Sequence, residues 1–313
     1  MSTPTSPQYV RHDRTGITKV ACYYHPRLFY DDQDISGHGL NMIDFSDPEN
    51  PVFHEGIIES LPFGVADICV SSTHLYLATP MLMGTDVIIY EFQGSVTNPV
   101  EVGTIPNADQ PNKLALINPH GPNKRLITGG DSTILAFDVD DPANVTPDGD
   151  YILSPGTLKD MITRQYRIFF TIYNSATQEG RLYALEHNTV LPNDLAEVGY
   201  VTLEGTGEAL YAWSPNIFVA DGEAGLSIYD VSDPTSMYLE SNTPLISDGV
   251  HIGVYGDLVG VLPWDAGLQM FDAASPDNPI ERSRLQVINS PQDAVIKDDV
   301  MIVAESAGSQ YAL

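Results

Sequence analysis

The feature that most constrains the fold is a strand-like segment that recurs along nearly the whole chain. Each copy is an apolar run that ends in an acidic residue and, in most copies, leads into a proline-containing turn. Successive copies begin 47, 47, 48, 44 and 42 residues apart. A period in the forties, in units built of strands, is the spacing of a propeller blade. The copies read LNMIDFSDPENP from Leu40, VIIYEFQGSVTNP from Val87, ILAFDVDDPANV from Ile134, LYALEHNTVLPN from Leu182, LSIYDVSDPTS from Leu226 and LQMFDAASPDNP from Leu268.

Each unit contains three further strand-like runs. An earlier pair of apolar runs is joined by a short turn, as in residues 66–79, 208–221 and 294–305. Another run follows the acidic turn, as in PVFHEGII from Pro51. Four antiparallel strands make one propeller blade. The sequence therefore predicts an all-β protein that forms a single domain over residues 1–313.

The two ends of the chain read as parts of one blade. The last residues, AGSQYAL from Ala307, match AGLSIYD from Ala224 and stop before the turn. Joining Leu313 to Met1 then aligns MSTPTSPQY with VSDPTSMYL without a gap. We therefore predict a seven-bladed β-propeller in which residues 1–10 complete the last blade. Closure by backbone hydrogen bonds would protect the edges of the ring.

Three of the recurring segments carry a family resemblance. LSIYDVSDP, LNMIDFSDP and LQMFDAASP resemble the LVIVD-type repeat, in which such a strand leads into a proline turn and an outer strand. The resemblance covers nearly the whole chain and implies a propeller. The copies from Val87 and Leu182 depart from it, since QGSVTNP and HNTVLPN stand where the Asp-Pro turn is expected. A fold does not imply a function, so the resemblance assigns no activity.

The charge of the chain limits its partners. It has 42 acidic residues against 14 basic ones, for a net charge of -28. Such a surface repels phosphate groups, which argues against nucleic acid and anionic membranes. Cations, basic peptides and neutral small molecules remain, and so does the interpretation that acidity only keeps the protein soluble. With no apolar run near the ~20 residues of a membrane span and no leader in the sequence as given, we expect a soluble monomer, cytoplasmic or secreted after removal of a signal.

Several reactive or charged side chains are predicted to be structural. Cys22 and Cys69 fall at equivalent positions of neighbouring inner strands, too far apart for a disulfide, and are predicted to be buried free thiols. Asp47, Asp141 and Asp233 precede prolines in the acidic turns, where a carboxylate accepts backbone N–H groups of the turn. These aspartates are predicted to be scaffold.

The varied loops gather at one end of the predicted propeller, here called the top face. It is the end at which the innermost strands begin, and it carries the loops between blades and between second and third strands. Loops on a rigid scaffold often hold binding residues. The candidate ligand-binding residues in these loops are Asp31, Asp32, Met81, Met83, Tyr173, Asp221 and Trp264.

The starts of the innermost strands form a second candidate site, around the axis. One interpretation is a salt-bridged plug. Another is a cation site, in which Asp67, Glu208 and Asp293 would hold an ion such as Ca²⁺. A third is a small-molecule pocket walled by the aromatic and Met residues of the loops, with Glu208, His251 and Asp67 orienting the ligand. The ring comprises Lys19, Asp67, Lys113, Asp160, Glu208, His251 and Asp293, and its lysines weigh against the cation site.

No catalytic signature stands out. The sequence has no phosphate-binding loop, nucleophile elbow, H-E-x-x-H or C-x-x-C motif. We therefore expect a propeller that binds a small molecule or a protein on its top face and that requires no cofactor. The alternative is an enzyme with a funnel pocket. It would be either a cofactor-free lyase, isomerase or cyclase that uses Glu208 and His251 to move protons, or a metal-dependent hydrolase resembling propeller lactonases.

Overall fold

The computed structural model describes residues 10–13, 21–34, 37–47, 50–61, 64–79, 87–106, 108–187, 195–264, 267–285, 291–297, 300–305 and 309–312. Within these ranges the chain forms 28 β-strands and no helix. The described residues therefore include no helix that could span a membrane. The all-β class predicted from the sequence is confirmed.

Hydrogen bonding arranges the strands in seven antiparallel four-stranded sheets. Six of them, called blades 1 to 6, are each built from four consecutive strands. Blade 1 comprises β2 (Ala21–Tyr24), β3 (Arg27–Asp34), β4 (Gly37–Asp44) and β5 (Val52–Leu61). Blade 2 comprises β6 (Asp67–Val70), β7 (His74–Ala78), β8 (Val87–Glu91) and β9 (Val100–Ile105). Blade 3 comprises β10 (Lys113–Ile117), β11 (Arg125–Gly129), β12 (Thr133–Asp138) and β13 (Thr146–Ile152). Blade 4 comprises β14 (Thr157–Arg164), β15 (Arg167–Asn174), β16 (Glu179–His187) and β17 (Leu195–Thr202). Blade 5 comprises β18 (Ala209–Trp213), β19 (Asn216–Ala220), β20 (Leu226–Asp230) and β21 (Tyr238–Thr243). Blade 6 comprises β22 (Gly249–Tyr255), β23 (Leu258–Pro263), β24 (Leu268–Asp272) and β25 (Ile280–Leu285).

The remaining sheet, called the composite sheet, joins segments from the two ends of the sequence. It has the order β1-β28-β27-β26. Its strands are β1 (Val10–Asp13), β26 (Pro291–Lys297), β27 (Val300–Glu305) and β28 (Ser309–Ala312). Asp13 pairs with Ser309 here as Thr243 pairs with Leu226 in blade 5. This is the register of the sequence alignment across the chain ends, but the strand lies at Val10–Asp13, and residues 1–9 of the predicted segment lie outside the described residues.

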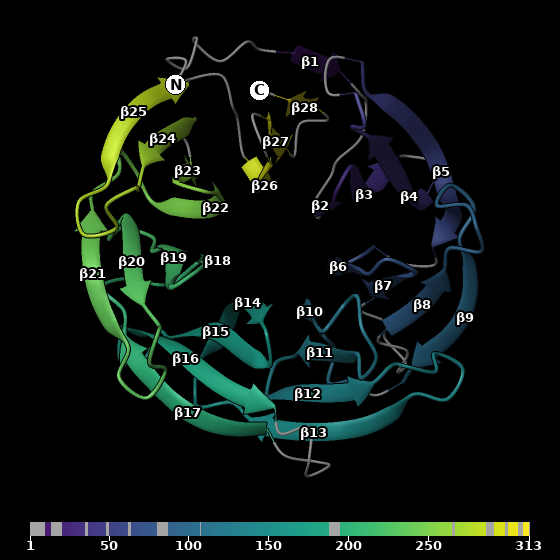
Figure 1. Cartoon of the computed structure of the whole chain (residues 1–313), viewed down its shortest axis with the longest axis horizontal. Helices are drawn as coiled ribbons and strands as arrows, with labels where there is room; N and C mark the ends of the chain where they lie inside the picture. The colour runs from purple at the N-terminus through teal and green to yellow at the C-terminus, as the bar shows by residue number, and fades with distance from the viewer. Residues whose placement is uncertain are drawn as a thin grey trace.

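The sheets stand around a common axis, as Figure 1 shows. The innermost strands are β2, β6, β10, β14, β18, β22 and β26, and each contacts the next, with β26 also contacting β2. The predicted propeller of four antiparallel strands per blade is therefore confirmed. Because all the innermost strands follow their inter-blade loops, they begin together at the top face and end together at the opposite bottom face.

The hydrophobic core consists of the seams between neighbouring blades. In the seam of blades 2 and 3, for example, Tyr76 and Ile89 pack with Leu116 and Phe137. Each side of a strand supplies residues to one seam, because successive side chains of a strand point to opposite faces of its sheet. Both faces of the inner strands are therefore apolar, which explains the unbroken apolar runs in the sequence.

The acidic end of the recurring segment shapes the turn that follows it. Asp230 accepts the backbone N–H of Ser232 at 2.7 Å, and Asp44, Asp138 and Asp272 make the same bond to the residue two positions on. The register between third and outer strands shifts near this point in blades 2 to 6, including the two blades whose turns depart from the repeat. The blade geometry therefore does not depend on the Asp-Pro pair.

The residues predicted to be structural have the expected roles. Asp141 and Asp233 accept N–H groups within their turns, and the Asp47 carboxylate accepts the side-chain amide of Asn50. Cys22 and Cys69 form no disulfide, and both are half-buried rather than buried. They pair with Phe29 and Tyr76 at equivalent places in their blades.

Candidate functional site

A network of charged groups ties the innermost strands together at the top face. The Nζ of Lys113 lies 3.0 Å from the Asp160 Oδ1 on the next blade. The Asp67 Oδ2 accepts the N–H of Leu114 at 2.6 Å, again from one blade to the next. Burial raises the pKa of Asp67 to about 6, against the opposing effects of Lys113 and of two backbone N–H donors. Lys113 therefore favours the charged form of Asp67 and forms an ion pair with Asp160.

A second inter-blade ion pair lies beside this network. The Lys159 Nζ lies 2.9 Å from Oε1 and 3.0 Å from Oε2 of Glu208, which precedes β18 in blade 5. The same ammonium lies 5.7 Å from the centre of the Tyr173 ring, and the Tyr173 hydroxyl donates to Gln178 Oε1 at 2.9 Å. Four of the predicted site residues, Asp67, Asp160, Glu208 and Tyr173, thus take part in contacts that join or brace blades.

Other predicted site residues are placed within the fold. Asp31 is buried in β3 and is 2% exposed, and His251 is half-buried in β22. Asp221 is fully buried after β19, where Oδ1 accepts the N–H of Gly207 and Oδ2 accepts the hydroxyl of Ser227, both at 2.9 Å. Burial raises the pKa of Asp221 to about 6. Its carboxylate faces the loop between blades 4 and 5 rather than solvent.

Some candidates cannot be located. Lys19, Met81 and Met83 lie outside the described residues. Asp32 and Asp293 belong to β3 and β26, but their side chains lie outside the described part. Among the side chains that are described, no three His, Cys, Asp or Glu residues gather in a way that could hold a metal ion.

Trp264 is the predicted site residue that stands out from the surface. Its side chain is 60% exposed, and its backbone N–H donates to the backbone carbonyl of Asp248 at 2.9 Å. Ile246, two residues before Asp248, is 41% exposed, and its backbone N–H donates to the side-chain Oε1 of Gln269 at 3.0 Å. Two large apolar side chains thus stand at the surface on residues whose backbone N–H groups are hydrogen-bonded, one to a carbonyl and one to a side-chain amide.

Backbone bonds fix the loop of blade 5 against blade 6 at the same place. Gly222 and Gly249 exchange two N–H···O bonds, of 3.2 and 3.0 Å. Gly222 has a φ of 59°, a conformation that favours glycine. A Cβ atom added to Gly205 would lie 1.9 Å from the carbonyl oxygen of Asp221. The loop between blades 4 and 5, which contains Gly205, therefore lies close against the backbone of the blade 5 loop. The loops around Trp264 therefore form one rigid unit.

Exposed carboxylates lie beside these glycines in the sequence. Glu204 precedes Gly205, Glu223 follows Gly222, and Asp248 precedes Gly249. All three are exposed, and none forms a salt bridge with a described side chain. We call Glu204, Glu223, Ile246, Asp248 and Trp264 the tryptophan patch.

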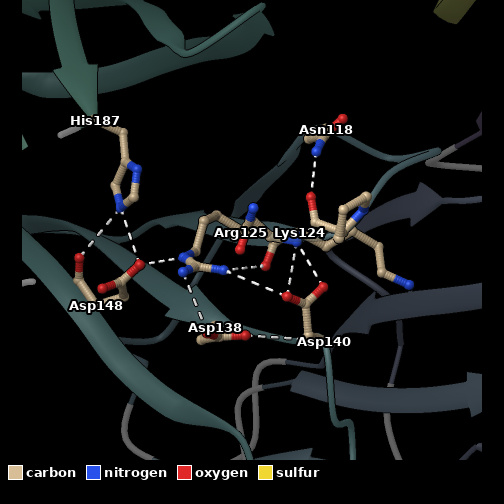
Figure 2. A network of polar contacts seen from close by, with 9 residues as sticks. Asn118, Lys124, Arg125, Asp138, Asp140, Asp148 and His187 are labelled. Atoms are coloured by element: carbon tan, nitrogen blue, oxygen red, sulfur yellow. Dashed lines mark hydrogen bonds and ion pairs between the residues drawn. The ribbon is translucent and has the colours of Figure 1, made fainter. Parts of the chain in front are cut away.

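A separate polar network lies at the bottom face, as Figure 2 shows. Arg125, which begins β11, bonds to Asp148 and lies 3.2 Å from Asp138. Asp148 in turn lies 3.1 Å from Nε2 of His187, which ends β16 in blade 4. His187 is 3% exposed, and its Nδ1 has no hydrogen-bond partner in the described structure. The network links blades 3 and 4 and was not predicted, because its residues share no motif.

Comparison with known proteins supports the fold. Residues 216–243 match the LVIVD repeat family, which confirms the resemblance in blade 5. No curated protein matches the chain.

Two solved structures share the architecture at low identity. Saccharomyces cerevisiae Sqt1 is 11% identical, with a TM-score of 0.66 over 94% of this chain and 81% of Sqt1. The computationally designed Ika8 protein is also 11% identical, with a TM-score of 0.61 over 96% of each chain. Such likeness shows the fold alone. The chain is therefore a β-propeller with an LVIVD repeat in blade 5.

Proposed function

We propose that the protein is an interaction propeller whose tryptophan patch binds a basic segment of a partner protein. The observation that carries the proposal is Trp264, which is 60% exposed on a loop bonded through its backbone to Asp248, in a chain of net charge -28. An exposed aromatic with polar neighbours on a rigid surface is a common centre of a protein interface.

The chemistry of the patch favours a lysine or arginine ligand. The face of an indole attracts a cation by about 0.5–2 kcal/mol. Glu204, Glu223 and Asp248 would add charge-assisted hydrogen bonds to other basic groups of the same partner segment. The basic side chains described at the top face, Lys113, Lys159 and Arg181, already pair with Asp160, Glu208 and Glu179, so they do not compete for the patch.

The rigidity of the patch supports the same conclusion. The bond from Trp264 to Asp248 and the pair between Gly222 and Gly249 involve backbone atoms alone. A surface that is ordered before binding loses little conformational entropy when a partner docks. Less of the interaction energy is then spent on ordering the loops.

The test is binding of fluorescein-labelled peptides rich in Lys and Arg, measured by fluorescence anisotropy. Trp264→Ala is expected to weaken binding about tenfold or more, because removing a central interface Trp costs ~2 kcal/mol or more. Trp213→Ala is the matched control, since Trp213 is 40% exposed at the bottom face. Equal affinities of the two variants would refute the proposal, and Glu223→Gln with Asp248→Asn gives an independent second variant.

A catalytic function has less support at the axis. Both oxygens of Glu208 contact Lys159. A carboxylate with both oxygens bonded to a lysine of the neighbouring blade is suited to joining blades more than to moving protons. A binding role therefore fits the contacts of Glu208 better than the predicted lyase, isomerase or hydrolase role does.

We also propose that the composite sheet serves as a seventh blade that closes the ring. It is supported by the pairing of β1 with β28 and by the contacts of β26 with both β22 and β2. Backbone hydrogen bonds between distant parts of the sequence would hold the ring shut where side-chain packing alone could slip.

A further inference from the structure

Most of the described basic side chains of this acidic protein form salt bridges, and the three that form none lie at the same face. Of the ten basic residues whose side chains are described, seven form salt bridges: Arg27, Lys113, Arg125, Lys159, Arg181, Arg282 and Arg284. The other three, Lys124, Arg164 and Arg167, form none with described side chains. All three lie at the bottom-face ends of β-hairpins in blades 3 and 4. With 42 acidic residues available, unpaired cations gathered at one end need an explanation.

Arg164 and Arg167 face each other across the β14–β15 hairpin. They are directly paired in the register of the two strands, and like charges at such positions are destabilising. Glu186 is the cross-strand neighbour of Arg167 on its other side, and Asp233 is close enough to feel its charge, yet neither forms a salt bridge with it. Arg164 has no such neighbour in the described structure. The fold therefore bears the cost of two adjacent unpaired guanidinium groups.

Two exposed aromatic side chains lie at the bottom-face ends of blades 4 and 5. Tyr166, in the hairpin turn, is 51% exposed, and Trp213, at the end of the neighbouring inner strand, is 40% exposed. The Trp213 ring lies 5.8 Å from that of Tyr255 in blade 6. Because β14 contacts β18 and β18 contacts β22, these residues follow one arc around the axis. Cationic and aromatic side chains thus share one surface, called here the arginine arc and comprising Arg164, Tyr166, Arg167 and Trp213.

From this juxtaposition we propose that the arginine arc binds an acidic segment of a second partner protein. The proposal goes beyond the tryptophan patch, because it concerns the opposite face and the opposite charge. Two adjacent guanidinium groups can form bidentate bonds with Asp and Glu side chains, and the aromatic rings supply apolar contact. The net charge of the chain does not prevent this, because charges beyond a Debye length of ~8 Å are largely screened at physiological ionic strength. A propeller with both surfaces would bridge a basic and an acidic partner.

The test uses the full chain and fluorescein-labelled peptides of Glu and Asp that contain one Phe. Arg164→Gln with Arg167→Gln is expected to weaken binding about tenfold, equal to ~1.4 kcal/mol. The matched control is Arg282→Gln with Arg284→Gln, which removes two arginines of β25 that form salt bridges. Its affinity is expected to equal that of the unmodified protein. Arg164→Lys with Arg167→Lys keeps the charge and is expected to restore part of the binding.

Several outcomes would overturn the proposal. One is no saturable binding of the acidic peptides, and another is equal loss in the two double variants. A dimer seen by sedimentation velocity that the Arg164/Arg167 variant converts to monomer would identify a second copy of the chain as the occupant. Preference for a single-stranded oligonucleotide over the acidic peptide would identify phosphate as the ligand. Trp264→Ala is expected to leave the affinity for the acidic peptide unchanged. A loss of binding at the arginine arc can then be told apart from a loss of binding at the tryptophan patch.

Discussion

Asp160 of blade 4 accepts the backbone N–H of Leu210 in blade 5, with 2.8 Å between Oδ2 and the nitrogen. Asp67 makes the equivalent bond to Leu114, two blades earlier. Each carboxylate thus satisfies an N–H group of the neighbouring inner strand, which has no sheet partner on that side. The axial carboxylates join blades by hydrogen bonds as well as by charge.

Asp160→Ala is expected to destabilise the protein by about 1.5–3 kcal/mol, the range for hydrogen bonds to charged groups. The loss has two sources, the unsatisfied N–H of Leu210 and the loss of the ion pair with Lys113. Urea denaturation followed by circular dichroism measures it. Asp131→Ala is the control, because Asp131 is exposed and has no bond in the described structure. Equal midpoints for the two variants would contradict the inter-blade role.

Asp221→Asn is expected to change how stability depends on pH. Burial raises the pKa of Asp221 to about 6, above its unfolded value of about 3.9. Between these values the folded chain binds a proton that the unfolded chain does not, so this contribution to stability is present at low pH and is lost as pH rises through 6. Relative to the unmodified protein, the variant should therefore gain stability between pH 4 and 7, on the order of 3 kcal/mol.

The control for this experiment is Asp131→Asn, whose difference from the unmodified protein should not vary between pH 4 and 7. Urea midpoints at several pH values give the comparison. Part of the dependence of stability on pH remains in both variants, because burial also raises the pKa of Asp67 to about 6. A constant difference between the Asp221 variant and the unmodified protein would show that Asp221 does not titrate in this range.

Removal of residues 1–13 tests the role of the composite sheet. This deletion takes away β1 and leaves β28 as an unpaired edge. It is expected to lower the melting temperature and to promote association, because exposed strand edges pair with other chains. Removal of residues 1–9 is the control, since it leaves all of β1 in place. If both deletions melt alike, β1 does not hold the ring closed.

The periodic parts of the fold were predictable from the sequence. The recurring segment from Leu226, for instance, contains its strand, the Asp230 bond that shapes the turn, and the turn itself within a few residues. Local hydrogen bonding leaves a signal in the sequence because the partners are near one another. The equivalence of Ser309 and Leu226 follows from the same signal.

The contacts between blades were not predictable. Alignment placed Asp67, Lys113 and Asp160 on one ring and left a salt-bridged plug as one interpretation. It did not say which residue bonds to which, because the partners belong to neighbouring blades some 47 residues away. Separations of 23 and 39 residues hide the Arg125–Asp148–His187 network in the same way. The opposition of Arg164 and Arg167 depends on the length of a turn in which Gln165 has a positive φ of 56°, a conformation uncommon outside glycine. Trp264 was singled out from its loop, whereas Ile246 and Glu223 were missed because they belong to other loops.

The loops around Trp264 are held by bonds between main-chain atoms: the Trp264 N–H to the Asp248 carbonyl, and Gly222 to Gly249. The side chains of Glu223, Asp248 and Trp264 take no part in these bonds, so they can change without disturbing the frame that carries them. Selection, or an engineer, can therefore exchange the indole and the carboxylates for other groups and give the same scaffold a new specificity.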